Sequence, residues 1–445
     1  MQLPSRFSLS PREPTLRLTR GGPGRDSRRA ISTVRSGAAP RADLKLGASR
    51  RQQLTRTGLA RISQMESLDT WEFPVSGGLV VSKAGLRGLC ILNSTAAEIW
   101  EYGRGNESPS SIAAFLSERY DVPFERALTD VLNCREQWRL MLTAERAGRM
   151  PVRLPPSPSS FHQTYSYNGC GFSVGLSTPE LVAEIEPRLR SLLSNREPSA
   201  VEFSMIVSDC GEWVHIHSGQ EFISAEASVP AARAVLLQEI VRRAAKPPRE
   251  WLAVIHAAAC GNETECVVFP GASHSGKTTL AAMLMRAGLT FYSDDSVAID
   301  KDGLRVHSMP FGLAIREGSW GLLESNIEGF DRAPVFDRYG GPVRFFYPPA
   351  KARAARVAAF VFPSYRPDSE FSIERLTTFD ALIKLKESGF WLENTRTGTC
   401  AFIDMVETAE CYAMLYSDTR DAAAFVRGLL NVSGLTEFPA GMTAC

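Results

Sequence analysis

The sequence predicts a mixed α/β protein in which a P-loop domain is preceded by a small winged-helix unit. A G-x-x-x-x-G-K-[ST] pattern stands at residues 271–278, between an apolar segment of strand length and a segment of helical composition. Further toward the amino terminus, two short apolar runs lead into three segments with apolar residues at helical spacing. These two patterns define two folded regions of different character.

Length, charge and hydropathy limit the classes of function. The chain has 445 residues, which is enough for two or three domains. Residues 1–64 hold 14 Lys and Arg against 3 acidic residues, whereas the remaining residues hold 36 against 46. A mildly acidic body lacks the basic footprint of a nucleic-acid-binding protein. No apolar run approaches the roughly 18 residues of a membrane-spanning helix. We therefore predict neither nucleic acid nor membrane as a partner.

The cysteines and residues 1–64 bear on where in the cell the protein is located. Nine cysteines without paired short spacing indicate reduced thiols, so we predict a cytoplasmic protein without zinc or disulfides. Residues 1–64 are rich in Arg, Ser, Gly and Pro, which predicts disorder. Because Met65 opens a well-patterned segment, an upstream extension from a misassigned start is an equal alternative. An organellar transit peptide is a third, and the missing apolar core excludes a signal peptide.

Residues 66–147 form the first predicted domain. Its expected elements are two strands and three helices, over 78–82, 88–92, a segment from 96 onward, 110–120 and 124–142, with Asn93 and Ser94 as helix caps. The run 92–100 (LNSTAAEIW), followed by Ile112 and the run 120–122 (YDV), resembles the PqqD family over about residues 72–145. That resemblance implies a peptide-recognition domain that adds a leader peptide as a strand beside the third helix. The alternative is a purely structural appendage.

The remaining chain divides at two predicted boundaries. Residues 148–160 are rich in proline and predict a semi-rigid linker. Residues 161–250 predict an α/β lobe, and residues 251–435 predict the catalytic domain. Within the lobe, strands are expected near 172–174, 201–207, 213–216 and 222–223, and helices over 179–193 and 230–244.

The P-loop pattern has the context that phosphate binding requires. Residues 266–269 read as a buried strand and residues 277–287 as a helix. Backbone amides of such a loop wrap phosphates, Lys277 reaches the β- and γ-phosphates, and Thr278 offers its hydroxyl to Mg²⁺. The predicted nucleotide-binding residues are Gly271, Ala272, Ser273, His274, Ser275, Gly276, Lys277, Thr278 and Thr279. We expect the His274 side chain to point outward.

Three further residues could carry chemistry beside the phosphates. Asp294 and Asp295 follow the strand-like run 291–293, where one carboxylate can accept a hydroxyl proton and the other can hold Mg²⁺. A solvated turn is the alternative for this pair. His256 ends the apolar run that begins at Trp251, and its imidazole serves either structure or proton transfer near phosphate.

Together these motifs resemble the HPr kinase/phosphorylase family and related proteins. The matching runs, with similar spacing, are 256–258, 271–281, 288, 294–295, 310–319, 343–349 and 362–365. The resemblance covers about residues 165–430. It implies a phosphoenolpyruvate-carboxykinase-like P-loop fold, with Asp294 as general base, Asp295 as metal partner and His256 as a phosphate-site residue. The second HPr kinase signature is missing, so neither HPr as substrate nor phosphorylase activity is carried over.

The predicted function is that of an ATP- and Mg²⁺-dependent serine kinase, a phosphotransferase, acting on a peptide or small protein captured by the PqqD-like domain. Catalysis is assigned to Asp294, His256 and Lys277, and Mg²⁺ to Thr278 and Asp295. Arg316, Arg344, Lys351 and Arg353 are candidates to neutralise transferring phosphate, with Arg344 favoured. Alternatives are a non-catalytic ATP-binding peptide chaperone switched by nucleotide, or a small-molecule kinase. Relatives often form oligomers, so a homo-oligomer is an open option.

Overall fold

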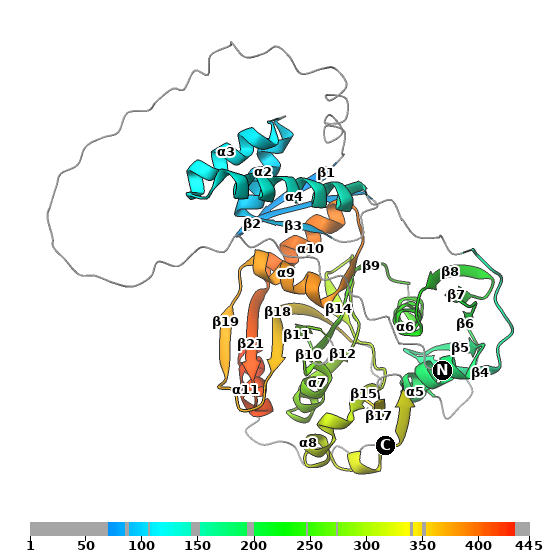
Figure 1. Cartoon of the computed structure of the whole chain (residues 1–445). Helices are drawn as coiled ribbons and strands as arrows, with labels where there is room; N and C mark the ends of the chain where they lie inside the picture. Colours follow the sequence, from blue (N-terminus) through cyan, green and yellow to red (C-terminus); the bar gives the residue numbers. More distant parts are fainter. Residues whose placement is uncertain are drawn as a thin grey trace, which may run out of the picture. The chain divides into compact units, whose positions relative to one another are not determined.

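The computed structural model describes residues 70–84, 89–105, 107–143, 152–193, 200–245, 248–272, 275–338, 341–348 and 353–431. Within these ranges the protein is mixed α/β, with several sheets (Figure 1). The expectations for residues 1–64 and for the first part of the linker, residues 148–151, lie outside the described residues. In the described part of the chain, no helix has the length and apolar character to cross a membrane.

The amino-terminal unit contains three strands and three helices among the described residues. Their bounds are β1 (Thr70–Val75), β2 (Gly78–Lys83), β3 (Cys90–Asn93), α2 (Ser94–Arg104), α3 (Pro109–Tyr120) and α4 (Phe124–Thr143). Asn93 caps α2 as predicted, because its side chain accepts a hydrogen bond from the Ala96 amide at 2.9 Å. Trp100 and Trp138 are buried and meet edge to face, with ring centroids 5.3 Å apart. The sequence prediction of two strands missed β1, which pairs antiparallel with β2.

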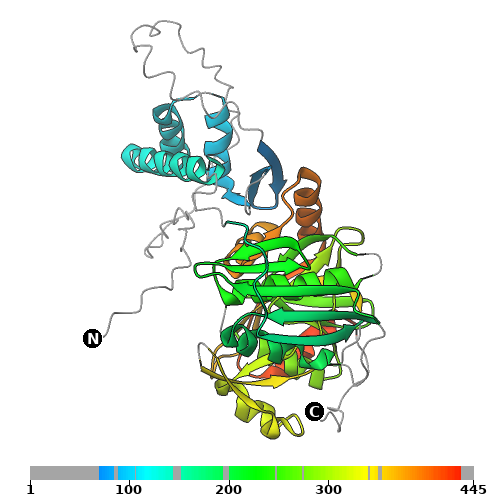
Figure 2. The same ribbon diagram turned by 90° about the vertical axis from the view of Figure 1, so that its right-hand side faces the viewer.

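A five-stranded sheet follows, and its strands lie side by side in Figure 2. Its elements are β4 (Phe161–Tyr167), β5 (Cys170–Leu176), α5 (Pro179–Leu189), η2 (Arg190–Leu192), β6 (Phe203–Asp209), β7 (Val214–Ser218), β8 (Glu221–Glu226) and α6 (Val229–Ala244). The predicted strands and helices of this lobe are present, and β4 was not predicted. Its hydrophobic core continues into Trp251, Val254 and Ala298, so the lobe packs directly on the next region.

The P-loop region is built on a ten-stranded sheet. Its helices and strands are β9 (Trp251–Ile255), β10 (Ala257–Gly261), β11 (Glu265–Pro270), α7 (Lys277–Arg286), β12 (Thr290–Ser293), β13 (Val297–Asp300), β14 (Arg305–His307), β18 (Ala354–Tyr365), β19 (Ser372–Arg375), α9 (Thr378–Ser388), β20 (Phe390–Leu392), α10 (Arg396–Thr408), β21 (Glu410–Tyr416) and α11 (Thr419–Leu429). The strand order is β12-β10-β11-β18-β14-β13-β9-β20, with β21 between β18 and β19.

Helices cover both faces of this sheet (Figure 1). Val267 and Phe269 of β11 pack in one cluster with residues of α7 and α11, whereas Cys266 and Val268 pack in a second cluster with residues of α9 and α10. Because successive side chains of a strand point to opposite faces, β11 is buried on both sides. The strand that leads into the P-loop is therefore held rigidly in a three-layer core.

A small three-stranded sheet flanks α7. Its strands are β15 (Leu313–Arg316), β16 (Val335–Arg338) and β17 (Gly341–Phe346), and the segment between β15 and β16 holds η3 (Glu317–Ser319), α8 (Trp320–Glu324) and η4 (Phe330–Arg332). Leu313 and Ile315 of β15 belong to the same hydrophobic cluster as α7. This packing places the start of β15 near the phosphate loop.

Candidate functional site

The phosphate loop joins β11 to α7 in the way the sequence predicts. Gly276 caps α7 in the left-handed region with φ of 92°, and a Cβ there would lie 2.6 Å from the Tyr416 hydroxyl. Glycine is therefore required at this position both for backbone conformation and for space. Two of the predicted nucleotide-binding residues, Ser273 and His274, lie outside the described residues.

Lys277 lies folded along its own loop. Its ammonium donates hydrogen bonds to the Gly271 carbonyl at 2.7 Å and the Ala272 carbonyl at 2.9 Å, and the residue is only 6% exposed. Burial lowers the pKa of Lys277, while the charges of Asp294 and Asp295 act in the opposite direction. The ammonium is thus electrostatically coupled to both acids.

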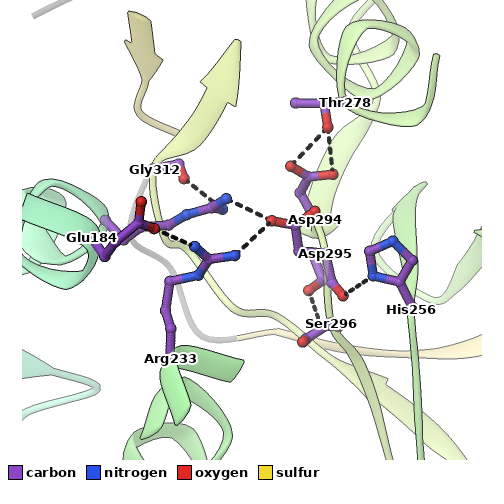
Figure 3. Close-up of polar contacts among 10 residues, drawn as sticks. Glu184, Arg233, His256, Thr278, Asp294, Asp295, Ser296 and Gly312 are labelled. Atoms are coloured by element: carbon purple, nitrogen blue, oxygen red, sulfur yellow. Dashed lines mark hydrogen bonds and ion pairs between the residues drawn. The ribbon is translucent and has the colours of Figure 1, made fainter. Parts of the chain in front are cut away.

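Asp294 faces the first turn of α7. The Thr278 hydroxyl lies 3.1 Å from each of its two carboxylate oxygens (Figure 3). Burial and the neighbouring charge of Asp295 raise the pKa of Asp294 to about 7, although Arg188, Lys277 and the Thr278 hydrogen bond oppose the rise. A carboxylate with this pKa is suited to accept a proton near neutral pH.

Asp295 has the opposite environment. Its backbone adopts φ of 65°, and its carboxylate accepts from the Arg188 guanidinium at 2.5 Å. Arg233 lies 3.8 Å from the same oxygen and points toward it from α6 (Figure 3). Burial alone would raise the pKa of Asp295, but the two guanidinium groups outweigh burial and hold it well below its usual range. The two adjacent acids therefore have different pKa values. In such a pair, the acid with the raised pKa can accept a proton near neutral pH, and the other stays ionised.

His256 stands at the end of β9, beside the acid pair. Its Nδ1 lies 3.1 Å from the Asp295 backbone carbonyl, and because a carbonyl only accepts, Nδ1 carries the proton. Burial lowers the pKa of His256, and the positive charge of Lys277 lowers it further. The ring is therefore neutral at pH 7, with Nε2 as an acceptor.

The sequence prediction missed Arg188 and Arg233. Both come from the lobe before the P-loop region, one from α5 and one from α6, and Arg188 is 4% exposed. Arg233 also binds Glu184 at 2.8 Å. No local feature of the sequence marks them, because their partner Asp295 lies 107 and 62 positions away. Only the folded chain brings them together.

The basic residues favoured from the sequence lie elsewhere. Arg344 pairs with Glu324 and stacks over the Trp320 ring at 4.3 Å, so the prediction that it meets the phosphates is not supported. Arg353 pairs with Glu263. Arg316 does line the cavity described next, and Lys351 lies outside the described residues.

One cavity of about 1620 Å³ is lined by most of the described candidate residues, whereas Gly271, Ala272 and Ser275 line a second cavity. Its walls come from α5, α6, the P-loop and α7, the Asp294–Asp295 turn, β15 and the loops after β18 and β21. Representative lining residues are Glu184, Arg188, Arg233, His256, Gly276, Lys277, Thr278, Thr279, Asp294, Asp295, Arg316, Tyr365 and Tyr416. A space of this size accommodates a nucleotide together with an acceptor group.

The described residues are compatible with a nucleotide and a hard cation. Ser275 has a buried hydroxyl oxygen without a hydrogen-bond partner among the described residues, which suits a phosphate oxygen. The described residues contain no group of three or more His, Cys, Asp or Glu that could hold a metal alone. Magnesium needs only one or two protein oxygens when phosphates supply the rest. The sequence analysis predicted Thr278 and Asp295 as the magnesium ligands, whereas in the structure the Thr278 hydroxyl contacts Asp294.

Comparison with known proteins identifies one region of the chain. The family model of Coenzyme PQQ synthesis protein D (PqqD) matches residues 87–139, so the chain contains a PqqD domain there. No curated protein matches the chain.

Among solved structures, the chain is similar to the Hpr(Ser) kinase/phosphatase from Coxiella burnetii, with 10% sequence identity over 40% of this chain and 93% of that chain. The TM-score of 0.19 is too low for either fold or function to be inferred from it.

Proposed function

We propose that this protein is an ATP- and Mg²⁺-dependent kinase that phosphorylates a serine hydroxyl of a peptide or small protein captured by its PqqD domain. The observation that carries the proposal is the pair Asp294 and Asp295, which line one cavity together with Lys277. The pKa of Asp294 is raised and the pKa of Asp295 is lowered. A phosphate loop with a proton acceptor of pKa about 7 is what transfer of phosphate to a hydroxyl requires.

In the proposed reaction, Asp294 takes the proton of the acceptor hydroxyl. The hydroxyl oxygen forms a bond to the γ-phosphorus of ATP while the bond to the β,γ-bridging oxygen breaks, and ADP leaves. Lys277 and the loop amides neutralise charge on the phosphate oxygens. Neutral His256 can accept a hydrogen bond through Nε2 without adding charge to the site.

Magnesium, when bound, would neutralise the β- and γ-phosphates. The Thr278 hydroxyl is one protein oxygen available to it, and one of the two acids is the other. Asp295 was the acid assigned from the sequence. The contact between Thr278 and Asp294 supports the other acid equally, so the two roles are separated only by testing both residues.

Arg188 and Arg233 fix the geometry of the acid pair. Arg188 is anchored on the far side by donating to the Gly312 carbonyl at 3.0 Å, so its guanidinium is held from two directions. The negative charge of Asp295 raises the pKa of Asp294, whereas the positive charge of Arg188 lowers it directly. In this proposal the lobe of α5 and α6 is part of the catalytic apparatus.

Capture of the acceptor is assigned to the PqqD domain. In the order β1-β2-β3, the outer strands each pair on one side only with another described strand, so an edge is available for an added peptide strand. The domain also contacts the kinase region, because the Asn394 side chain donates to the Lys83 carbonyl at 2.7 Å and accepts from Ser82 at 3.0 Å. Holding the peptide on the same chain raises its effective concentration at the kinase site.

The test uses the full chain, radiolabelled ATP and synthetic serine-containing peptides encoded by neighbouring genes. We expect label on the peptide with the wild-type protein and with Asp302→Asn, a surface control. Asp294→Asn should bind ATP but transfer label at least about 100-fold more slowly, because the proton acceptor is lost. Equal rates for Asp294→Asn and wild type would refute the assigned base.

The same experiment separates the alternatives. A peptide chaperone switched by nucleotide would transfer no label, yet ATP would change its affinity for the peptide in fluorescence anisotropy. A small-molecule kinase would label a small hydroxyl acceptor and leave every peptide unlabelled. For the proposed kinase, a Ser→Ala version of the peptide should bind and compete without being labelled.

A further inference from the structure

The loops after β18 and β21 emerge beside the phosphate loop. Strand β11 pairs parallel with β18, and β18 pairs parallel with β21, with Tyr365 opposite Tyr416 in the register. The carboxyl ends of these three strands therefore lie at one edge of the sheet. Ligands of open α/β sheets bind in the crevice outside that edge.

Tyr365 and Tyr416 form an aromatic pair against the last residue of the phosphate loop. A Cβ on Gly276 would lie 2.6 Å from the Tyr416 hydroxyl and 3.2 Å from the Tyr365 Cβ. Tyr416 is 1% exposed, and its ring meets that of Tyr365 at 65° with centroids 5.6 Å apart. Tyr365, in contrast, is 49% exposed as a residue and lines the large cavity. A large exposed aromatic ring with rigid backing stands next to the phosphate site.

Hydrogen bonds hold this aromatic pair in place. The Arg366 amide donates to the Tyr416 carbonyl at 3.0 Å, and the Ser417 hydroxyl donates to the Ser369 carbonyl at 2.8 Å. The loop after β18 is thereby tied to the end of β21. A ring fixed in this way loses little conformational entropy when a ligand stacks on it.

We infer that the exposed ring of Tyr365 is the stacking platform for the base of the nucleotide whose phosphates the P-loop binds. This inference rests on the proposed function and adds the nucleoside subsite to it. The acid pair, where phosphate transfer is assigned, and the two tyrosines line the same cavity, so a nucleotide with its phosphates at the P-loop can extend toward the tyrosines. Stacking needs only the face of a base, so Tyr365 provides affinity with little choice among bases.

A second cavity offers the competing location. It has a volume of about 490 Å³, and its walls include Ala272 and Ser275 of the phosphate loop, Ser364 of β18 and Lys384 of α9. Side chains alternate along β18, so Ser364 and Tyr365 point to different faces of the sheet. Phe362 is the one aromatic residue among the described residues lining this second cavity, which makes the cavity less suited to a nucleotide base. Substitution of Lys384, which lines only this one of the two cavities, tests whether the base binds there.

The test measures binding of ATP and of inorganic tripolyphosphate, a probe without a base, by calorimetry in Mg²⁺. We expect Tyr365→Ala to weaken ATP binding about 5- to 150-fold and to leave tripolyphosphate binding unchanged. Tyr365→Phe should bind both probes like wild type, because the ring is kept. Trp391→Ala, which removes an exposed aromatic residue outside both cavities, is the matched control.

Three results would overturn the inference. Wild-type ATP affinity in Tyr365→Ala, with loss in Lys384→Ala, would place the base in the second cavity. Equal weakening of both probes by Tyr365→Ala would mean that the ring only supports the loop. A wild-type protein that binds neither probe would remove the proposed nucleotide function, and the base subsite with it. Retained tripolyphosphate binding also shows that Tyr365→Ala is folded.

Discussion

Replacement of Arg188 by glutamine tests how the lobe controls the acid pair. The Arg188 side chain is 4% exposed and makes two charge-assisted or polar contacts, to Asp295 at 2.5 Å and to the Gly312 carbonyl at 3.0 Å. Removing one partner of a buried ion pair costs about 3–5 kcal/mol. The Asp295 side chain is 33% exposed and keeps Arg233 at 3.8 Å, so we expect the lower end, about 3 kcal/mol.

The same substitution changes the pH dependence of catalysis. Arg188 lowers the pKa of Asp294, which is about 7 in the intact site. Without Arg188 this pKa rises, so Asp294 becomes deprotonated only at higher pH. We expect the acidic limb of kcat/KM for phosphate transfer to move above pH 7, because Asp294 must be ionised to act as base.

Unfolding in guanidinium chloride measures the loss of stability. The rate of label transfer between pH 5 and 9 measures the shift of the acidic limb of kcat/KM. Arg190→Gln is the matched control on the neighbouring turn, because Arg190 is 41% exposed and pairs with Glu186 at the surface. Arg190→Gln should lower the free energy of unfolding by no more than about 1 kcal/mol and should not shift the acidic limb of kcat/KM. An Arg188→Gln protein with the wild-type unfolding midpoint and an unshifted limb would refute the assigned role.

Three other predictions concern stability. Asp294→Asn should stabilise the protein at pH 8 but not at pH 4 in urea unfolding, because a folded-state pKa raised to about 7 means that ionisation of Asp294 opposes folding as pH rises; equal stability at pH 8 would contradict this. Burial opposes ionisation of Asp300, but hydrogen bonds from His307 and backbone amides outweigh it and lower the pKa of Asp300 to about 2. Asp300→Asn should therefore cost about 2 kcal/mol at pH 7, and the difference from wild type should disappear as pH falls from 4 to 2. Gly276→Ala should lower the thermal midpoint more than Gly211→Ala, which has a similar φ of 84° but nothing within 4 Å of the added methyl group; equal shifts would exclude the clash with Tyr416.

Local patterns in the sequence predicted most of the elements that position the site. The strand β11, the loop and α7 follow from a buried apolar run, glycines and helical spacing, all of which act over a few residues. The helices α5 and α6 were predicted for the same reason, each with proline in its first turn. These features depend on neighbouring residues, so a sequence displays them.

Strands β1 and β4 are among those that the sequence analysis missed, and their patterns are weak. Strand β4 reads FHQTYSY and buries only Tyr165 and Tyr167, so its polar residues hide the alternation. Strand β1 contains Pro74, which argues against a strand unless it lies at a sheet edge, where β1 lies. In both cases pairing with a better-patterned neighbour decides the structure.

The arginines of the site could not be predicted from the sequence. Arg188 lies near the end of α5 and Arg190 begins η2 two positions later, yet one is buried against Asp295 and the other pairs with Glu186 at the surface. The difference depends on which side of α5 faces the Asp294–Asp295 turn, and that is fixed by long-range packing. Arg344 was favoured among four basic residues downstream of the core motifs, but its side chain contacts Trp320 and Glu324.

The position of Lys277 has a consequence for ligand affinity. Its ammonium makes hydrogen bonds to two loop carbonyls, so the triphosphate of the proposed function would have to displace these acceptors in order to bind Lys277. Part of the interaction free energy is used to open the loop, which weakens the observed dissociation constant relative to a preformed cradle. Under the proposed function, the loop carbonyls therefore compete with phosphate oxygens for the Lys277 ammonium.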